Sequence, residues 1–142
     1  MTTPALSGGC LCGAVRYLAA DPPRVSVVCH CRSCRVAAGG TSVAWVTVPA
    51  AGFAFEGEAP ARFASSPGVQ RTFCGRCGAS LTYAHEGRPD EIDITTVTLD
   101  EPEVFAPTKE IFTAERVSWS APVLGMPQFA GSSAAPAAET GG

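Results

Sequence analysis

Seven cysteines, grouped in three short clusters, constrain this chain of 142 residues more than any other feature. The first cluster is a CxC pair, Cys10 and Cys12; the second is a CxCxxC at positions 29, 31 and 34; the third is a CxxC at positions 74 and 77. An odd number of thiols leaves one over in any disulfide scheme, and cysteines two apart rarely meet disulfide geometry. Clustered thiolates are typical zinc ligands. The pattern therefore predicts a metal-stabilised fold in place of a disulfide framework.

The spacing of two clusters predicts a closed zinc site. Cys74 and Cys77 form a knuckle, and Gly78 directly after it tolerates a positive φ, so that backbone N–H groups can point at sulfur. Cys10 and Cys12 point to the same side of an extended segment and supply two further ligands. Structural zinc contributes on the order of 10–16 kcal/mol in small peptides. We therefore expect the fold to require this four-cysteine site.

The remaining cluster, Cys29, Cys31 and Cys34, has no fourth cysteine. Its fourth ligand could be His30, His85, a carboxylate or water. His30 lies between two ligands and is expected to point away from the ion, and His85 is expected to be exposed. The simplest interpretation is a zinc ion with three thiolates and one exchangeable position, which would present a substrate thiol as thiolate to an electrophile. A second structural site, or cysteines that bind metal incidentally, is the alternative that the residues leave open.

Arginines accompany the cysteine clusters. Arg32 and Arg35 flank Cys34, and Arg71 and Arg76 flank the CxxC knuckle. One interpretation is that they compensate thiolate charge. The other is that Arg32 or Arg35 holds a carboxylate of a peptide-like substrate thiol.

Charge and hydropathy argue against nucleic acids and membranes as partners. The net charge is −3 and the isoelectric point about 5.3, which disfavours nucleic-acid binding because an acidic surface repels phosphates. No apolar run approaches the roughly 18 residues that span a membrane. The first residues lack the features of a signal peptide, so we expect a cytoplasmic protein whose thiols stay reduced.

Composition predicts a mainly β protein with little helix, because 15 glycines and 12 prolines separate short β-branched segments. We expect one domain over residues 1–130 and a disordered tail over 131–142, which lacks large apolar groups. One helix is expected over 32–38, ended by Gly39. Strands are expected over residues 14–18, 24–28, 42–48, 53–57, 69–73, 80–83 and 91–99.

Five segments carry a resemblance to a known family: GGCLCGAVRY from Gly8, CHCRSCRVAAGG from Cys29, FCGRCGASLTY from Phe73, DITTVTLDEPEVF from Asp93 and WSAPVLGMPQF from Trp119. Over about residues 7–130 the chain resembles the glutathione-dependent formaldehyde-activating enzyme (GFA) family, also called the CENP-V domain. The resemblance implies an Mss4-like zinc-binding β fold of short antiparallel strands. It also implies a carbon–sulfur lyase activity that forms S-(hydroxymethyl)glutathione. The implied zinc ligands are Cys10, Cys12, Cys74 and Cys77 for a structural ion, and Cys29, Cys31 and Cys34 for a catalytic ion.

The chain departs from the family at one position. Members often carry a histidine in a P-x-x-H-I pattern, whereas Pro107 is followed here by Glu110 and Ile111. No residue stands out as a general acid, so His30 and Glu110 are only candidates. Our hypothesis is an enzyme that joins a glutathione-like thiol to a small aldehyde such as formaldehyde, or releases it. The alternative is a non-catalytic, zinc-stabilised Mss4-like binding module, since one fold can serve several roles.

Overall fold

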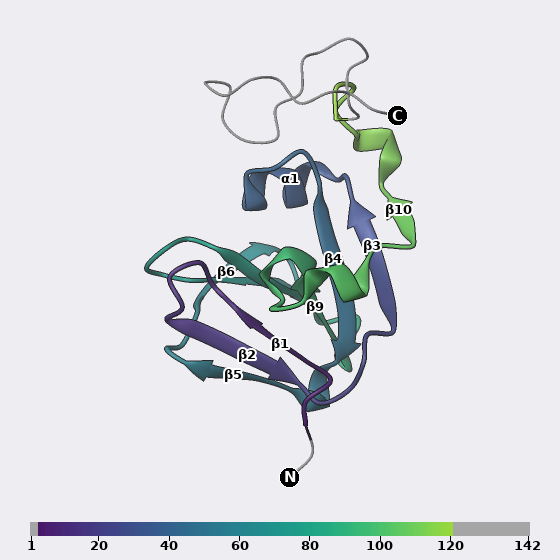
Figure 1. The fold of residues 1–142 in the computed structure, drawn as a ribbon. Helices are drawn as coiled ribbons and strands as arrows, with labels where there is room; N and C mark the ends of the chain where they lie inside the picture. The colour runs from purple at the N-terminus through teal and green to yellow at the C-terminus, as the bar shows by residue number, and fades with distance from the viewer. Residues whose placement is uncertain (1–2, 121–142) are drawn as a thin grey trace, which may run out of the picture.

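Short segments with alternating buried and exposed side chains form two β-sheets in the computed structural model, which describes residues 3–120 (Figure 1). The smaller sheet has three antiparallel strands in the order β1-β2-β5. Their bounds are β1 Leu6–Gly9, β2 Val15–Ala19 and β5 Phe53–Gly57.

The larger sheet has seven strands in the order β10-β3-β4-β9-β8-β7-β6. Neighbouring strands run antiparallel except β10 and β3, which pair in parallel through three residues. The bounds are β3 Val25–Cys29, β4 Val43–Pro49, β6 Ala61–Ser66, β7 Val69–Phe73, β8 Ser80–His85, β9 Glu91–Thr95 and β10 Lys109–Ile111.

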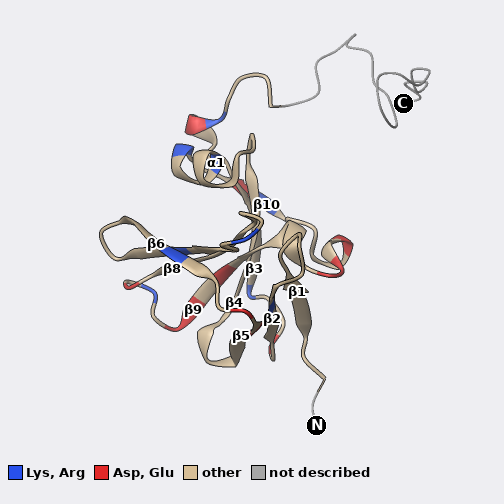
Figure 2. Cartoon of the chain, turned by 90° about the vertical axis from the view of Figure 1, so that its left-hand side faces the viewer, with Lys and Arg blue, Asp and Glu red and all other residues tan. Residues whose placement is uncertain are grey.

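Helical structure is limited to α1 (Arg32–Ala38) and four short 3₁₀ turns within residues 3–120. Gly39 ends α1 in the left-handed region at φ 70°, as the sequence predicts. In both views α1 lies at the end of the molecule opposite the N-terminus, with β10 near it (Figure 2). The 3₁₀ turns are η1 Ala50–Gly52, η2 Thr96–Thr98, η3 Pro102–Phe105 and η4 Thr113–Glu115.

Strand β4 places apolar side chains on both faces of the larger sheet, because successive side chains of a strand point to opposite sides. Val46 and Val48 are fully buried in the core that includes residues of both sheets. Val43 and Trp45 belong to a second apolar cluster, which also contains Cys29 and Cys34. One face of the sheet therefore packs in the core, and the other builds the surroundings of the three-cysteine cluster.

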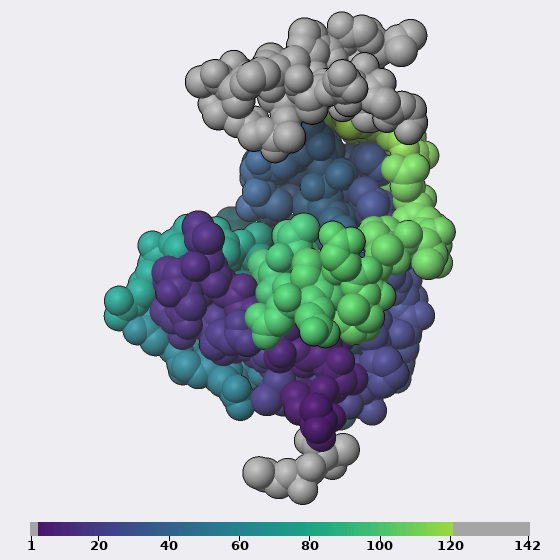
Figure 3. Space-filling model, viewed as in Figure 1, coloured from purple at the N-terminus to yellow at the C-terminus, as the bar shows by residue number. Residues whose placement is uncertain are grey.

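The segment after β9 crosses to the smaller sheet (Figure 3). Leu99 forms a β-bridge with Gly8, and Asp100 accepts two hydrogen bonds from the Arg16 guanidinium, at 2.9 and 2.6 Å. The predicted strand over 91–99 is therefore too long. The chain leaves the strand after Thr95 and turns through η2, where the Thr98 hydroxyl is 2.7 Å from the Tyr17 hydroxyl.

The predicted mainly β class with little helix is confirmed. The predicted helix over 32–38 matches α1, and the other predicted strands are found within a few residues of their expected ends. Sequence reasoning missed β1, β6 and β10. The predicted tail over 131–142 and the end of the predicted domain lie outside the described residues. Among residues 3–120, no helix is long and apolar enough to cross a membrane.

Candidate metal centres and the adjoining cavity

The four cysteines of the first and third clusters meet between the two sheets. Cys10 and Cys12 lie in the loop after β1, and Cys74 and Cys77 lie in the turn between β7 and β8. Their sulfur atoms all lie within 4.8 Å of one another, with Cys10–Cys12 at 3.6 Å and Cys12–Cys74 at 3.8 Å. A tetrahedral zinc with bonds near 2.3 Å separates its sulfurs by roughly 3.8 Å. The four sulfurs therefore fit one tetrahedral metal ion.

The backbone of the CxxC turn has the geometry of a metal knuckle. Gly78 adopts φ 78°, and the amides of Arg76 and Cys77 donate to the Cys74 sulfur at 3.3 and 3.4 Å. A hydrogen bond from the Ala79 amide is the largest contribution that lowers the pKa of Cys77, to about 6. Amide donors stabilise the charged form of sulfur, which is the form that binds metal.

The three cysteines of the second cluster meet where β3 runs into α1. Cys29 is the last residue of β3, Cys31 is the N-cap of α1, and Cys34 lies in its first turn. Their sulfurs also lie within 4.8 Å of one another. The Cys34 amide donates to the Cys31 sulfur at 3.4 Å, so Cys31 both caps the helix and belongs to the cluster. This set offers three metal ligands and would leave a tetrahedral ion one open position.

Burial opposes ionisation of the second cluster without a metal. It is the largest contribution that raises the pKa of Cys29, to about 12, and it also raises the pKa of Cys34. For Cys31, burial acts in the same direction, but hydrogen bonds from the Cys34 amide and the neighbouring thiols outweigh it and lower the pKa. A divalent ion would favour the thiolate form of all three.

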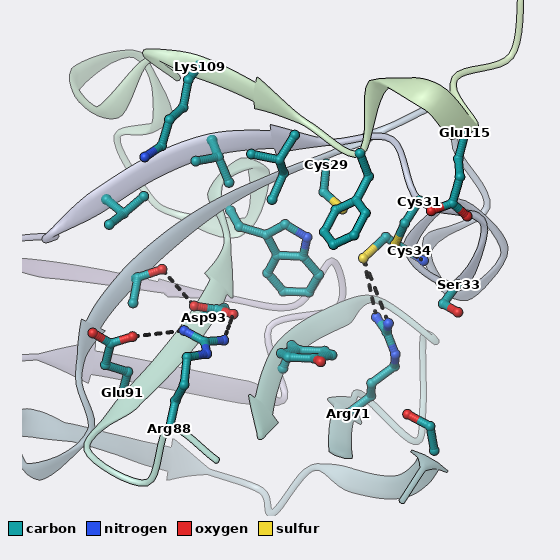
Figure 4. A pocket seen from close by; sticks show the side chains of 18 residues that line it. Cys29, Cys31, Ser33, Cys34, Arg71, Arg88, Glu91, Asp93, Lys109 and Glu115 are labelled. Atoms are coloured by element: carbon teal, nitrogen blue, oxygen red, sulfur yellow. Dashed lines mark hydrogen bonds and ion pairs between the residues drawn. The ribbon is translucent and has the colours of Figure 1, made fainter. Parts of the chain in front are cut away.

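A cavity of about 640 Å³ adjoins the second cluster (Figure 4). Cys29, Cys31 and Cys34 lie at one end and Arg88, Glu91 and Asp93 at the other, so the cavity joins the sulfurs to a polar end. Its lining is completed by Val25, Val27, Ser33, Trp45, Thr47, Ser66, Arg71, Tyr83, Lys109, Ile111, Phe112 and Glu115.

Three basic residues line this cavity in different electrostatic settings. Arg88 is neutralised by ion pairs with Glu91 at 2.8 Å and Asp93 at 2.7 Å. Lys109 forms no ion pair with any residue in the described part of the chain. Arg71 is 7% exposed and donates to the Cys34 sulfur.

The predicted substrate residues Arg32 and Arg35 lie on α1 outside the cavity lining. Arg32 is exposed, and its backbone amide donates to the Glu115 carboxylate at 3.1 Å. The Arg35 side chain donates to the backbone carbonyl of His30 at 3.1 Å. Their role in substrate binding stays a prediction.

Neither histidine is one of the residues that group into the candidate metal sites of the described chain. His30 is 4% exposed, and its Nε2 is 2.9 Å from the Glu110 carboxylate, which also accepts from Arg116. The His85 ring is partly exposed, and its Nδ1 accepts from the Gly87 amide. Neither Glu110 nor His30 lines the cavity.

Sequence reasoning missed several residues of the cavity. Phe112 carries the one positive φ of a non-glycine residue in the described chain, 55°, and lines the cavity directly after β10. Lys109 and Glu115 lie in the same short segment. The signal that could have found them is their position in the chain, because they lie within or just after the segment that begins at Pro107, where the chain departs from the family pattern.

Comparison with known proteins gives three findings. Residues 5–115 match the model of a family described as glutathione-dependent formaldehyde-activating enzyme. A protein of Schizosaccharomyces pombe named as an uncharacterized lyase is 32% identical over 90 residues, and the match covers 58% of this chain and 59% of that protein. The crystal structure of a Rhodobacter sphaeroides protein has a TM-score of 0.60 at 19% identity, covering 73% of this chain and 98% of the other, which shows a shared fold.

Proposed function

Because the chain belongs to the glutathione-dependent formaldehyde-activating enzyme family, we propose that it is a carbon–sulfur lyase that joins a small, glutathione-like thiol to a small aldehyde such as formaldehyde, or releases it. The proposal includes zinc as the metal of both ligand groups, the four cysteines 10, 12, 74 and 77 and the three cysteines 29, 31 and 34. The observation that carries it is a difference between the two metal-ligand groups: Cys29, Cys31 and Cys34 line the cavity, whereas the other four cysteines are not among its lining residues. A substrate sulfur can reach the three cysteines from the cavity, and four cysteines leave a tetrahedral metal no open position.

A zinc ion on the three cysteines would supply an open position that takes a substrate thiol in its thiolate form. The protein's own residues bind and orient the rest of the substrate. Val27 and Trp45 form an apolar wall that excludes water from the reacting sulfur. Lys109, a cation without an ion-pair partner in the described chain, holds a substrate carboxylate.

The reaction also needs a group that moves one proton. When the thiolate adds to the aldehyde, a carbon–sulfur bond forms, the carbonyl π pair moves to oxygen, and that oxygen takes a proton. Glu115 lines the cavity beside the cysteines, whereas His30 and Glu110 bond to each other outside it. In this proposal Glu115 takes the proton that the substrate thiol loses and gives it to the carbonyl oxygen of the aldehyde. In the reverse direction Glu115 takes the hydroxyl proton, the carbon–sulfur bond breaks, and the proton returns to the thiol.

The first prediction concerns Cys31. The Cys31→Ser variant should fold, because serine is a good N-cap residue and can accept from the Cys34 amide in the same way. It should bind one zinc ion per chain instead of two and lose catalysis. We would measure formaldehyde consumption with glutathione above the uncatalysed rate, together with zinc content and far-ultraviolet circular dichroism.

Two outcomes separate the enzyme from the binding module. Consumption above background by the wild type, and a background rate in Cys31→Ser with the fold retained, supports the enzyme. Equal rates for the two proteins would contradict it and would favour a non-catalytic, zinc-stabilised module.

A further inference from the structure

Arg71 is a buried cation without a carboxylate partner. It lies on β7 with 7% of its surface exposed, and it makes no ion pair with an acidic residue between residues 3 and 120. Its Nε donates to the Ser65 hydroxyl at 3.1 Å, and its guanidinium lies over the Tyr83 ring, 4.9 Å from the centroid. These contacts hold its orientation but bring no negative charge.

Both terminal nitrogens of Arg71 point at one sulfur. Nη1 and Nη2 lie 3.9 and 3.7 Å from the Sγ of Cys34, which Figure 4 shows as a pair of dashed lines. A guanidinium stays charged at all relevant pH values, and burying it is costly unless an anion is close. The sulfur that both nitrogens contact belongs to a thiol that becomes an anion when the cluster binds a metal ion.

A charge count shows what this cation does for the cluster. Three thiolates and one divalent ion carry one net negative charge, which Arg71 cancels. A fourth thiolate from a substrate adds another negative charge in a site that is already buried, and like charges disfavour this. The adjacent guanidinium reduces that repulsion.

We propose that Arg71 is the counter-charge of the three-cysteine cluster and a positioning residue for the incoming thiolate. The positioning role rests on the proposed function, whereas the counter-charge role concerns the three-cysteine cluster alone. Arg71 acts through its contact with the Cys34 sulfur. Its positive charge lowers the electrostatic cost of placing a further thiolate at the open position. Its role in this proposal differs from that of Lys109, which holds a remote part of the substrate.

The test uses the cobalt(II)-substituted protein and its thiolate-to-metal charge-transfer band. Arg71→Met and Arg71→Gln both remove the positive charge. Arg71→Gln also keeps a hydrogen-bond donor for the Ser65 hydroxyl, so the test still works if Arg71→Met does not fold. Arg71→Lys is the conservative rescue. Arg62→Met, an exposed arginine on the neighbouring strand that donates to Gln70, is the matched control. The four-cysteine cluster contributes equally to every spectrum.

We expect the neutral variants to move the band to longer wavelength, because sulfur loses the stabilisation of a nearby positive charge. Arg71→Lys should restore part of the shift, and Arg62→Met should show none. A band identical to that of the wild type in the folded neutral variants would overturn the counter-charge.

Binding of 2-mercaptoethanol, an uncharged probe thiol, tests the positioning role of Arg71. An opposite charge nearby shifts an ionisation by about 1–3 pK units, so the neutral variants should bind the probe about 10-fold more weakly or worse. Unchanged affinity overturns the positioning role. If the wild type itself binds no thiol while the band still shifts in the variants, the proposed function fails and the counter-charge stands.

Discussion

Lys109 and Arg32 are two exposed basic side chains, and they differ in whether they face the cavity. Lys109 lines the cavity and Arg32 does not. We predict that Lys109→Ala raises the KM for glutathione about fivefold, which corresponds to the roughly 1 kcal/mol of an exposed charge pair, with little change in kcat. Steady-state kinetics at varied glutathione concentration would measure this.

Arg32→Ala is the matched control and should leave KM unchanged. The opposite result, a higher KM in Arg32→Ala alone, would return the carboxylate-binding role to the residue that the sequence suggested. An uncharged thiol should show the same KM with both variants, since it offers no carboxylate.

At the residue scale, the candidate metal ligands could be predicted from the sequence, whereas the contact between Arg71 and Cys34 could not. In the sequence Arg71 flanks the CxxC knuckle, but its side chain meets Cys34, 37 positions away. Alternation along a strand predicts that Arg71 and Cys74 face opposite sides, because they are three residues apart. Which sulfur lies on the other side depends on how β7 packs near α1, and no local pattern encodes that.

At the element scale, β10 is the strand whose attachment shapes the cavity. It is three residues long, lies at the edge of the larger sheet, and leads into Phe112 and η4. The His30–Glu110 contact at 2.9 Å joins it to the residue after β3. Two backbone hydrogen bonds continue this attachment, from His30 to Ile111 and from Thr108 to Ser26.

We predict that Glu110→Ala loosens β10 without unfolding the protein. Glu110 contacts His30 and Arg116, and only the contact with His30 joins β10 to the residue after β3. One such hydrogen bond contributes about 0.5–1.5 kcal/mol, so hydrogen exchange of the His30 and Thr108 amides should accelerate about 2- to 10-fold. Glu103→Ala, an exposed acid on η3, is the control and should leave both rates unchanged. Equal exchange in Glu110→Ala and the wild type would mean that strand pairing alone holds β10.

The sequence could not predict β10 for a physical reason. The residues Lys109–Ile111 contain one apolar side chain, and their pairing partner β3 lies about eighty positions earlier in the chain. Parallel pairing depends on tertiary context more than on local preference. By contrast, α1 was predictable because Gly39 marks its end locally.

At the scale of the whole molecule, the two clusters should respond differently to metal removal. We predict that graded chelation removes one zinc ion per chain first, from the three-cysteine cluster, with little loss of β structure. Removal of the second ion should unfold the protein, since a structural zinc contributes on the order of 10 kcal/mol, comparable to the net stability of a domain. Zinc release and circular dichroism, followed together, measure both steps.

Cys31→Ser should show only the second step, because its three-cysteine cluster is already impaired. Simultaneous loss of both ions and of the β structure in the wild type would contradict the division into an open and a closed site.

At the scale of the whole molecule, the division of the cysteines into a group of four and a group of three could be predicted from their number and spacing. The cavity could not, because its lining comes from many separate elements that only the folded sheet brings together.

The wide separation of the ligands of the four-cysteine cluster has a consequence for biosynthesis. Cys12 and Cys74 are 62 positions apart, whereas the other cluster lies within a single strand-to-helix turn. A ribosome therefore completes the ligands of the three-cysteine cluster well before it makes Cys74 and Cys77. Until then the Cys10–Cys12 pair offers only two of the four ligands, and a metal ion could not yet join the smaller sheet to the larger one.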